Sequence, residues 1–231
     1  MKLDDVQRNY DRLSRSYDFW NRWLIEPFVG IEGLRQRTVD ALELPQGGSV
    51  LDIACGTGLN LPYLARQVGP EGQLVGLDYS PGMLAQAGRR AQAAGWENVR
   101  LVQGDAAVLA GVGGPFDGVM STWALGIVDD LPAALRRAVE VLRPGGRLAI
   151  LDLDRSRAER GLRRLFDPIL HLGLRLSGVD SAEDLDDERL AQRWQDGQAF
   201  LHQALEDVRV ERNTWGSGFL LLGRRPERDD E

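Results

Sequence analysis

The sequence is poor in several residues on which particular classes of protein depend. Among its 231 residues, Cys55 is the only cysteine, which rules out a disulfide within the chain and argues against sites built from several thiols. Lys2 is the only lysine, and a net charge of −7 disfavours non-specific binding to nucleic acid. No apolar run approaches the ~18 residues of a membrane-spanning helix, and the polar N-terminus does not resemble a signal peptide. These features favour a soluble, cytoplasmic protein with one sizeable α/β domain.

The most informative segment, Val50–Gly58, reads VLDIACGTG. An apolar run contains an acid, Asp52, and is followed by a glycine-rich turn. Gly56 and Gly58 allow the backbone to turn sharply and to approach a ligand closely. Apolar residues then recur at helical spacing over 61–68. Strand, glycine turn and helix in this order are typical of a nucleotide site at the carboxyl end of a parallel sheet.

A second acid, Asp78, ends the next apolar run. In nucleotide-binding βαβ units an acid at this place accepts hydrogen bonds from the ribose hydroxyls. A dinucleotide fingerprint would require glycine where Leu61 stands, and Asp52 ahead of the glycines would repel a pyrophosphate. A ligand with a ribose and a cationic amino group but no phosphate fits better, which favours S-adenosylmethionine over NAD.

On these residues the chain resembles the class I S-adenosylmethionine-dependent methyltransferases, most closely the branch with quinone-biosynthesis and phospholipid N-methyltransferases. The family's pattern, an acid followed by x-G-x-G-x-G, begins here at Asp52, with Ala54 in place of the first glycine. The resemblance covers roughly residues 46–154. It implies a Rossmann-like, doubly wound, seven-stranded α/β sheet, mostly parallel with an antiparallel C-terminal hairpin. Further segments that match the family are Asp78–Leu84 for ribose, Gly104–Ala106 for adenine, Phe116–Asp117, and Val141–Leu148.

The alternation of expected strands and helices independently predicts a parallel sheet with helices on both faces. We expect strands at 74–78, 99–102, 116–122, 147–153, 207–213 and 218–222, besides the one before the glycine turn. Ser80 is expected to cap one helix that ends at Gly95, and Asp129 or Asp130 another. A single domain, 1–231, would comprise an N-terminal helical lid (1–45), a cofactor-binding core (46–154), a variable substrate-side insertion (155–205), a C-terminal hairpin (206–225) and a charged tail (226–231).

The motif positions provide a set of candidate site residues. Trp123 follows the fourth strand and fits a pocket or the core equally well, and the N-terminal helix could equally be a lid or simply pack on the sheet edge. His171, His202, Tyr10 and Tyr17 are candidate bases, of which His171 and Tyr17 are preferred. No cluster with metal-ligand spacing is present. The candidate cofactor residues are Asp52, Ala54, Cys55, Gly56, Gly58, Asp78, Tyr79, Met83, Gly104, Asp105, Ala106 and Ser121, and the candidate substrate residues are Tyr10, Trp20 and Trp123.

The resemblance implies methyl transfer from S-adenosylmethionine, with S-adenosylhomocysteine as product and no metal. A sulfonium methyl is already activated, so the enzyme must align the reactants, exclude water and remove a proton where needed. The segment after the fourth strand lacks the motif of base and glutamine methyltransferases. Arginines at 155–164 before a leucine-rich stretch favour an amphiphilic acceptor, a quinone precursor or phospholipid head group, with peripheral contact at the inner membrane surface. The alternatives are a water-soluble metabolite or natural product as acceptor, a non-catalytic binding module, and an NAD-dependent oxidoreductase.

Overall fold

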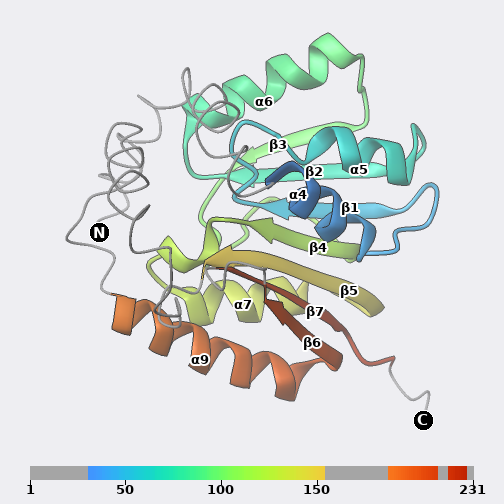
Figure 1. Cartoon of the computed structure of the whole chain (residues 1–231). Coiled ribbons are helices and arrows are strands. Elements are labelled where there is room, and N and C mark those ends of the chain that lie inside the picture. The colour runs from blue at the N-terminus through green and yellow to red at the C-terminus, as the bar shows by residue number, and fades with distance from the viewer. Residues whose placement is uncertain (1–30, 154–186, 213–217, 228–231) are drawn as a thin grey trace.

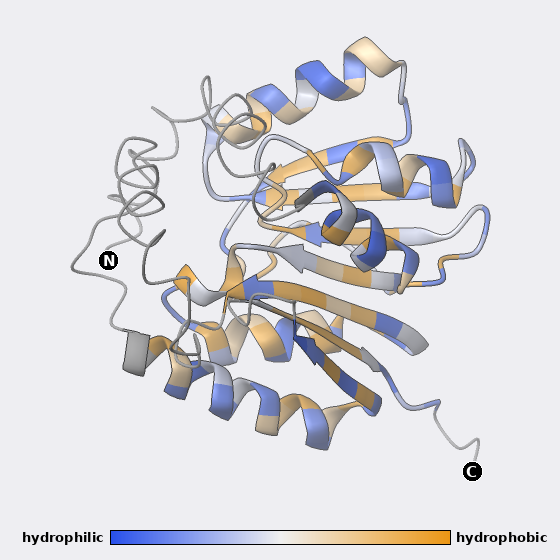
Figure 2. Cartoon of the chain, in the orientation of Figure 1, coloured by the Kyte–Doolittle hydropathy of each residue, from blue (hydrophilic) through white to orange (hydrophobic). Residues whose placement is uncertain are grey.

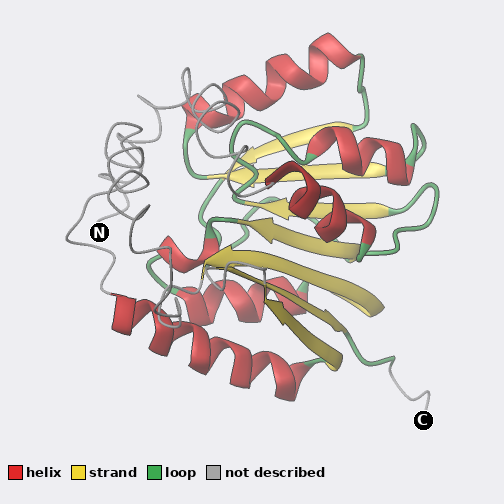
Figure 3. Cartoon of the chain, viewed as in Figure 1, coloured by secondary structure: helices red, strands yellow, loops and turns green. Residues whose placement is uncertain are grey.

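The computed structural model describes residues 31–153, 187–212 and 218–227, and the account below concerns this part of the chain. Seven strands form one sheet with helices on both faces (Figures 1 and 3). The strands are β1 (Ser49–Ile53), β2 (Gln73–Asp78), β3 (Val99–Gln103), β4 (Phe116–Thr122), β5 (Leu142–Leu153), β6 (Glu206–Arg212) and β7 (Gly218–Arg224). The helices are α4 (Ile31–Asp40), α5 (Leu61–Val68), α6 (Pro81–Ala94), the short 3-10 helix η2 (Leu125–Ile127), α7 (Leu131–Glu140) and α9 (Asp187–Ala204).

The strand order in the sheet is β3-β2-β1-β4-β5-β7-β6. The strands from β3 to β5 run parallel to one another, whereas β7 runs antiparallel to both β5 and β6. The prediction of a mostly parallel seven-stranded sheet with an antiparallel C-terminal pair is confirmed. The order reverses beside β1, because β2 follows it on one side and β4 lies on the other. In open α/β sheets, ligands bind at the carboxyl ends of the strands beside such a reversal.

The central strands are apolar because helices cover both of their faces. In β1, all four residues from Val50 to Ile53 are at most 1% exposed. Figure 2 shows hydrophobic residues along the central strands and a mixture of both kinds on the helices. Parallel strands buried on both faces are expected to be continuous apolar runs. Asp52 is therefore an exception within β1, and a buried carboxyl group requires a local explanation.

The core consists of two apolar clusters, one on each face of the sheet. Helices α4 and α5 contribute residues such as Val39 and Leu64 to one cluster, and α7 and α9 contribute Leu135 and Trp194 to the other. The indole of Trp194 meets the ring of Phe219 of β7 edge to face, with ring centroids 4.9 Å apart. The last part of the expected substrate-side insertion is thus a helix packed into the core.

The helix boundaries predicted from capping residues are confirmed. The Ser80 hydroxyl accepts a hydrogen bond from the Met83 N–H at 3.1 Å at the start of α6, and Gly95 ends that helix with a left-handed φ of 70°. At α7 the capping residue is Asp130, whose carboxylate accepts from the Ala133 N–H at 2.9 Å. These caps fix where the chain leaves the sheet after β2 and β4.

Strand β5 is longer than the sequence predicts. Its expected start is Arg147, but the strand begins at Leu142, which pairs with Phe116 of β4. A shift in register follows before Gly118 pairs with Arg147. The reason is that the chain between the two pairs contains Gly145 at a φ of 74°, so the glycine turn expected there is absorbed into the strand as an irregularity.

Candidate functional site

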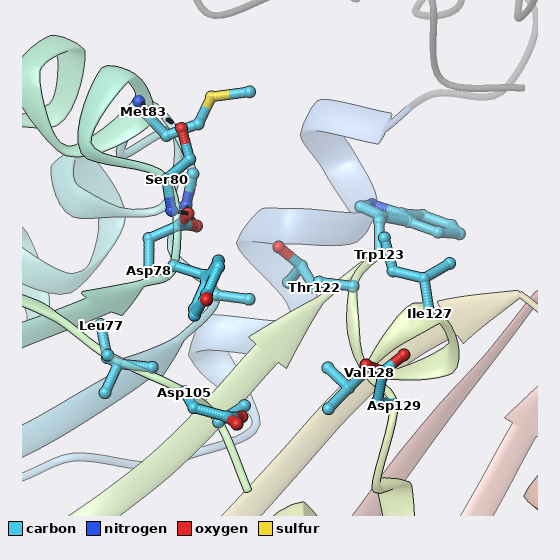
Figure 4. A pocket seen from close by; sticks show the side chains of 16 residues that line it. Leu77, Asp78, Ser80, Met83, Asp105, Thr122, Trp123, Ile127, Val128 and Asp129 are labelled. Carbon is cyan, nitrogen blue, oxygen red and sulfur yellow. Dashed lines mark hydrogen bonds between the residues drawn. The ribbon is translucent and has the colours of Figure 1, made fainter. Parts of the chain in front are cut away.

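A cleft opens at the carboxyl ends of β1, β2 and β4, beside the reversal in strand order. The cleft and its open mouth together contain about 850 Å³ of free space. Residues 77–83 form one wall and residues 122–129 the opposite wall (Figure 4). The lining residues are Ala54, Gly56, Leu77, Asp78, Tyr79, Ser80, Met83, Gly104, Asp105, Ala106, Thr122, Trp123, Ala124, Ile127, Val128 and Asp129.

The two glycines of the turn after β1 serve different purposes. Both have left-handed backbone, with φ of 56° at Gly56 and 77° at Gly58. A Cβ atom at Gly56, which lines the cleft, would have no atom within 4 Å. At Gly58 a Cβ would lie 2.7 Å from Leu61 Cδ1 and 3.1 Å from Ala87 Cβ. Gly56 therefore leaves room for a ligand, whereas Gly58 leaves room for the packing of α5 and α6.

Two residues of the lining have left-handed backbone although they are not glycine. Ala54, at the place of the family's first glycine, has φ of 55°, and Trp123 at the end of β4 has φ of 61°. This region costs residues with a Cβ roughly 1–2 kcal/mol. Such conformations persist only where the surroundings enforce them, and they concentrate at binding sites. The Trp123 N–H, which donates to the Leu151 carbonyl at 2.7 Å, is one such restraint.

The Asp78 carboxylate ties the glycine turn to the start of α6. Its Oδ2 accepts from the Gly56 N–H at 2.8 Å, and its Oδ1 accepts from the Ser80 N–H at 2.9 Å. A carboxylate oxygen can accept more than one hydrogen bond, so an acid at this position can also bind hydroxyl groups of a ligand. The geometry is therefore compatible with the ribose role that the sequence predicts for Asp78.

Behind the cleft, four side chains from different elements form a buried polar network. Arg35 of α4 donates from Nη1 to Asn60 Oδ1 at 2.9 Å and to Thr122 Oγ1 at 2.7 Å. Asn60 in turn donates from Nδ2 to Asp52 Oδ2 at 2.9 Å. None of the four residues is more than 7% exposed. The other oxygen of Asp52, Oδ1, has no hydrogen-bond partner among the described residues.

Burial dominates the ionisation of Asp52. It raises the pKa of the carboxyl group from 3.8 to about 7, although the hydrogen bond from Asn60 and the charge of Arg35 both act to lower the pKa. The Asp78 carboxylate raises it further. A cationic group placed near Oδ1 would favour the ionised form and supply the missing partner. Asp52 thus fits a ligand that carries an ammonium group.

Two predicted cofactor residues, besides Asp52 and Gly58, lie outside the lining of the cleft. Cys55 packs against β2, where a Cβ on Gly76 would come within 2.9 Å of its Sγ. Burial, and then the Asp78 and Asp52 carboxylates, raise the pKa of the Cys55 thiol, so it stays protonated and is not a nucleophile. Ser121 of β4 is buried behind Thr122 and does not reach the cleft.

The third side of the cleft is formed by the segment that comes directly after β3 in the chain. The Gly104 N–H donates to the carbonyl of Asp78 at 3.1 Å, which keeps this segment next to β2. The Asp105 carboxylate accepts from the Ala107 N–H at 2.8 Å and so closes a tight turn. The lining here combines backbone with the apolar side chains of Leu77 and Ala106. A flat, apolar ring with polar edges suits such a surface.

Nine predicted site residues lie on the lining: Ala54, Gly56, Asp78, Tyr79, Met83, Gly104, Asp105, Ala106 and Trp123. Four, His171, Tyr17, Tyr10 and Trp20, lie outside the described residues. Sequence reasoning missed Arg35 and Asn60. A signal for the first existed, since Arg35, Val39 and Leu42 follow the i, i+4, i+7 spacing of a buried helix face. Nothing in the sequence singled out Asn60.

Comparison with known proteins identifies the family. A family model described as "Methyltransferase domain" matches residues 50–146. A 2-phytyl-1,4-naphtoquinone methyltransferase of Thermosynechococcus vestitus is 38% identical over 153 residues, which are 66% of each chain. The chain belongs to the class I S-adenosylmethionine-dependent methyltransferases. Members of this family use S-adenosylmethionine as methyl donor.

Two further similarities concern a second relative and a solved structure with this fold. A demethylmenaquinone methyltransferase of Listeria welshimeri is 34% identical over 151 residues, covering 65% of this chain and 63% of the relative. The matched stretch thus covers about two thirds of the length of each relative. The crystal structure of a methyltransferase from Aquifex aeolicus has the same fold, with a TM-score of 0.57 at 18% identity over 83% of this chain and 89% of the other.

Two features are absent from the part of the chain that the structure describes. In residues 31–153, 187–212 and 218–227, no group of three or more His, Cys, Asp and Glu side chains could hold a metal ion. Within the same ranges, no helix has both the length and the apolar character needed to cross a membrane.

Proposed function

We propose that this methyltransferase-family protein transfers a methyl group from S-adenosylmethionine to a small, partly apolar acceptor of the quinone type, and releases S-adenosylhomocysteine. The observation that carries the proposal is the contrast between the walls of one cleft. The carboxylate of Asp78 lies on one side, whereas the apolar side chains of Trp123, Ile127 and Val128 lie on the other. A charged donor and an apolar acceptor would each meet a suitable wall.

The cofactor residues follow from the chemistry of each part of the ligand. Asp78 would accept hydrogen bonds from the ribose hydroxyls with its carboxylate oxygens, which already hold the Gly56 and Ser80 N–H groups. Asp52 would balance the α-ammonium group, since its buried Oδ1 has no hydrogen-bond partner within the described part of the chain. The segment Gly104–Ala106 would contact the adenine. When bound, the cofactor supplies a methyl group that its sulfonium charge has already activated.

The protein would then act chiefly by orientation. The described part of the chain places no histidine on the cleft, since His202 belongs to α9 and is not part of the lining. His171 and Tyr17 remain proposed bases, and Tyr10 and Trp20 proposed substrate contacts; all four lie outside the described residues. Holding donor and acceptor in line and excluding water accounts for most of the rate enhancement that such transfers need.

The acceptor class rests on the lining of the wall together with the relatives' names. Apart from Thr122 and Asp129, the side chains of residues 122–129 that line the cleft are apolar. The two relatives are named for methylation of a phytyl-naphthoquinone and of demethylmenaquinone. Both names describe a ring with a long apolar tail. A wall with an apolar centre is suited to such a ring because its burial removes apolar surface from water.

Transfer of radiolabelled methyl groups tests the proposal. The purified protein is incubated with labelled S-adenosylmethionine and, separately, with demethylmenaquinone in detergent micelles, a polar metabolite extract and tRNA. We expect label in the quinone. Label in the polar extract alone would contradict the quinone class but not methyl transfer. Failure of S-adenosylmethionine to bind in calorimetry would contradict the donor as well.

Peripheral membrane contact is a separate proposal. An acceptor with a long apolar tail resides in lipid, and the arginine-rich segment 155–164, which lies outside the described residues, could meet anionic head groups. Replacing Arg163 and Arg164 together by Glu should weaken sedimentation with anionic liposomes. Unchanged sedimentation of the variant, or none by the wild type, would contradict this contact.

A further inference from the structure

The wall of the cleft formed by residues 123–129 is fixed by two charged side chains that do not line it. Asp152 stands near the carboxyl end of β5, and Arg193 lies on α9. Both reach the same short segment, which contains η2. Neither belongs to the lining, and neither is part of the sequence pattern that identifies the family.

Asp152 holds the beginning of η2. Its Oδ2 accepts from the Gly126 N–H at 2.8 Å, and its Oδ1 accepts from the Leu153 N–H at 2.7 Å. The residue is 4% exposed. Burial raises the pKa of Asp152 to about 6, while hydrogen bonds from the backbone and the charge of Arg193 lower it. A buried carboxyl group is costly to desolvate, and backbone N–H groups directed at it offset this cost.

Arg193 holds the end of the same segment. Its Nη1 donates to the Gly126 carbonyl at 3.2 Å, and its Nη2 donates to the carbonyls of Val128 and Asp129, the latter at 3.3 Å. Guanidinium is the group suited to several carbonyls at once, because its donors form a rigid fork. Asp152 thus binds N–H groups of the segment and Arg193 binds its carbonyls.

Gly126 lies where the two anchors meet. A Cβ at this position would come within 3.1 Å of both Leu190 Cδ1 and Trp194 Nε1, and within 3.5 Å of Asp152 Oδ1. Trp194 also packs against Phe219 of β7, so α9 holds the segment close to the sheet. The backbone of the wall is therefore set by β5 and α9 together.

We propose that Asp152 and Arg193 are positioning residues that hold the segment 123–129 in the shape that receives the acceptor, and that they set acceptor affinity without setting cofactor affinity. This inference rests on the proposed function. Its geometric basis is that both side chains act on the backbone beside Ile127 and Val128, whereas the opposite wall is tied to Asp78. Loosening the anchors would move one wall alone, and displacements of ~1 Å near reacting groups can cost ~100-fold in rate.

The first measurement does not require turnover. In Arg193→Ala, hydrogen exchange at the amides of residues 124–128 should rise about tenfold or more, while exchange in the turn 54–58 should stay within about twofold of wild type. Gln192→Ala, which removes an exposed neighbour on α9 that pairs with Asp196, is the matched control and should change neither region. Unchanged exchange at 124–128, or an equal rise in both regions, would overturn the proposal.

The second measurement separates acceptor from cofactor. With demethylmenaquinone as acceptor, Arg193→Ala should raise its KM about tenfold or more and leave the calorimetric Kd of S-adenosylmethionine within about twofold. Arg193→Lys keeps the charge but loses the forked guanidinium donors, so its KM for the acceptor should lie between those of Arg193→Ala and wild type. It replaces Arg193→Ala if that variant does not fold. Equal loss of both affinities would overturn the positioning role. If wild type methylates no quinone, the proposed function fails, and the exchange experiment still decides the anchoring.

Discussion

The contacts that hold the two walls of the cleft differ in how far apart their partners lie in the sequence. On the cofactor side, Asp78 binds Ser80, two residues away, and Gly56, 22 residues away. On the acceptor side, Gly126 is held from 26 residues away by Asp152 and from 67 by Arg193, and Thr122 from 87 by Arg35. The first wall is therefore built within one βαβ unit, and the second exists only when the whole sheet and α9 are assembled. If the second wall receives the acceptor as proposed, substitutions far from the cleft should be able to change the substrate preference.

The largest effect should come from Arg35, whose hydrogen bond to Thr122 joins the residues that lie farthest apart in the sequence among these contacts. Arg35→Met removes two hydrogen bonds from a charged donor, each worth about 1.5 kcal/mol or more, so we expect about 3 kcal/mol less stability. Urea unfolding measures this. Arg66→Met is the control, because the Arg66 side chain bonds Gln36 at the surface. If the two variants were equally stable, the network behind the cleft would be contributing little to the fold.

Substitutions of the two glycines in the turn test whether Gly58 serves the packing of the fold and Gly56 serves cofactor binding. Gly58→Val forces a branched side chain against Leu61 and Ala87 and should cost about 2 kcal/mol of stability. Gly56→Ala places a methyl group in free space on the lining but at a left-handed φ of 56°, so it should cost about 1 kcal/mol of stability, less than Gly58→Val, and weaken cofactor binding at least about tenfold. Thermal unfolding and calorimetry on both variants distinguish the two effects. The reverse pattern would mean that the roles of the two glycines are exchanged.

Asp78→Ala should act on the cofactor side alone. The variant loses hydrogen bonds from ribose hydroxyls and from Gly56, so S-adenosylmethionine binding should weaken at least about tenfold, or about 1.4 kcal/mol. Glu97→Ala, an exposed acidic residue away from the cleft, controls for the change in charge. Calorimetry that found normal affinity in a folded Asp78→Ala variant would contradict the ribose assignment.

A last prediction concerns the pH dependence of stability without cofactor. The folded-state pKa of Asp52, about 7, lies above its ordinary value of 3.8, so the folded state binds the extra proton and stability falls as pH rises between these values. Asp152, with a pKa of about 6, adds to this fall over a narrower range. Asp52→Asn should flatten the decline in Tm between pH ~5 and ~7 while weakening cofactor binding. An unchanged pH slope would show that Asp52 is not the titrating group.

Local patterns explain why much of the fold was predictable. The acids after apolar runs, the Ser80 and Asp130 caps and the glycine turn are short-range signals, and each specifies an element or its end. The cofactor wall follows from the same signals because its contacts lie within them. The acceptor wall could not be predicted in this way, since Arg193 meets Gly126 only after α9 packs on the sheet. Gly58 shows a further limit, because a motif does not reveal whether its glycine faces a ligand or a helix.

The position of β7 also constrains how the sheet can be assembled during synthesis. Although β7 follows β6 in the chain, it lies between β5 and β6 and pairs with both. Until residues 218–224 have been synthesised, the edge of β5 from Leu148 to Leu151 has no strand beside it, and apolar strand edges of this kind invite pairing with other chains. Translation of the intervening α9 and β6 is therefore the interval in which a nascent chain is most exposed to aggregation, and it closes when β7 is inserted.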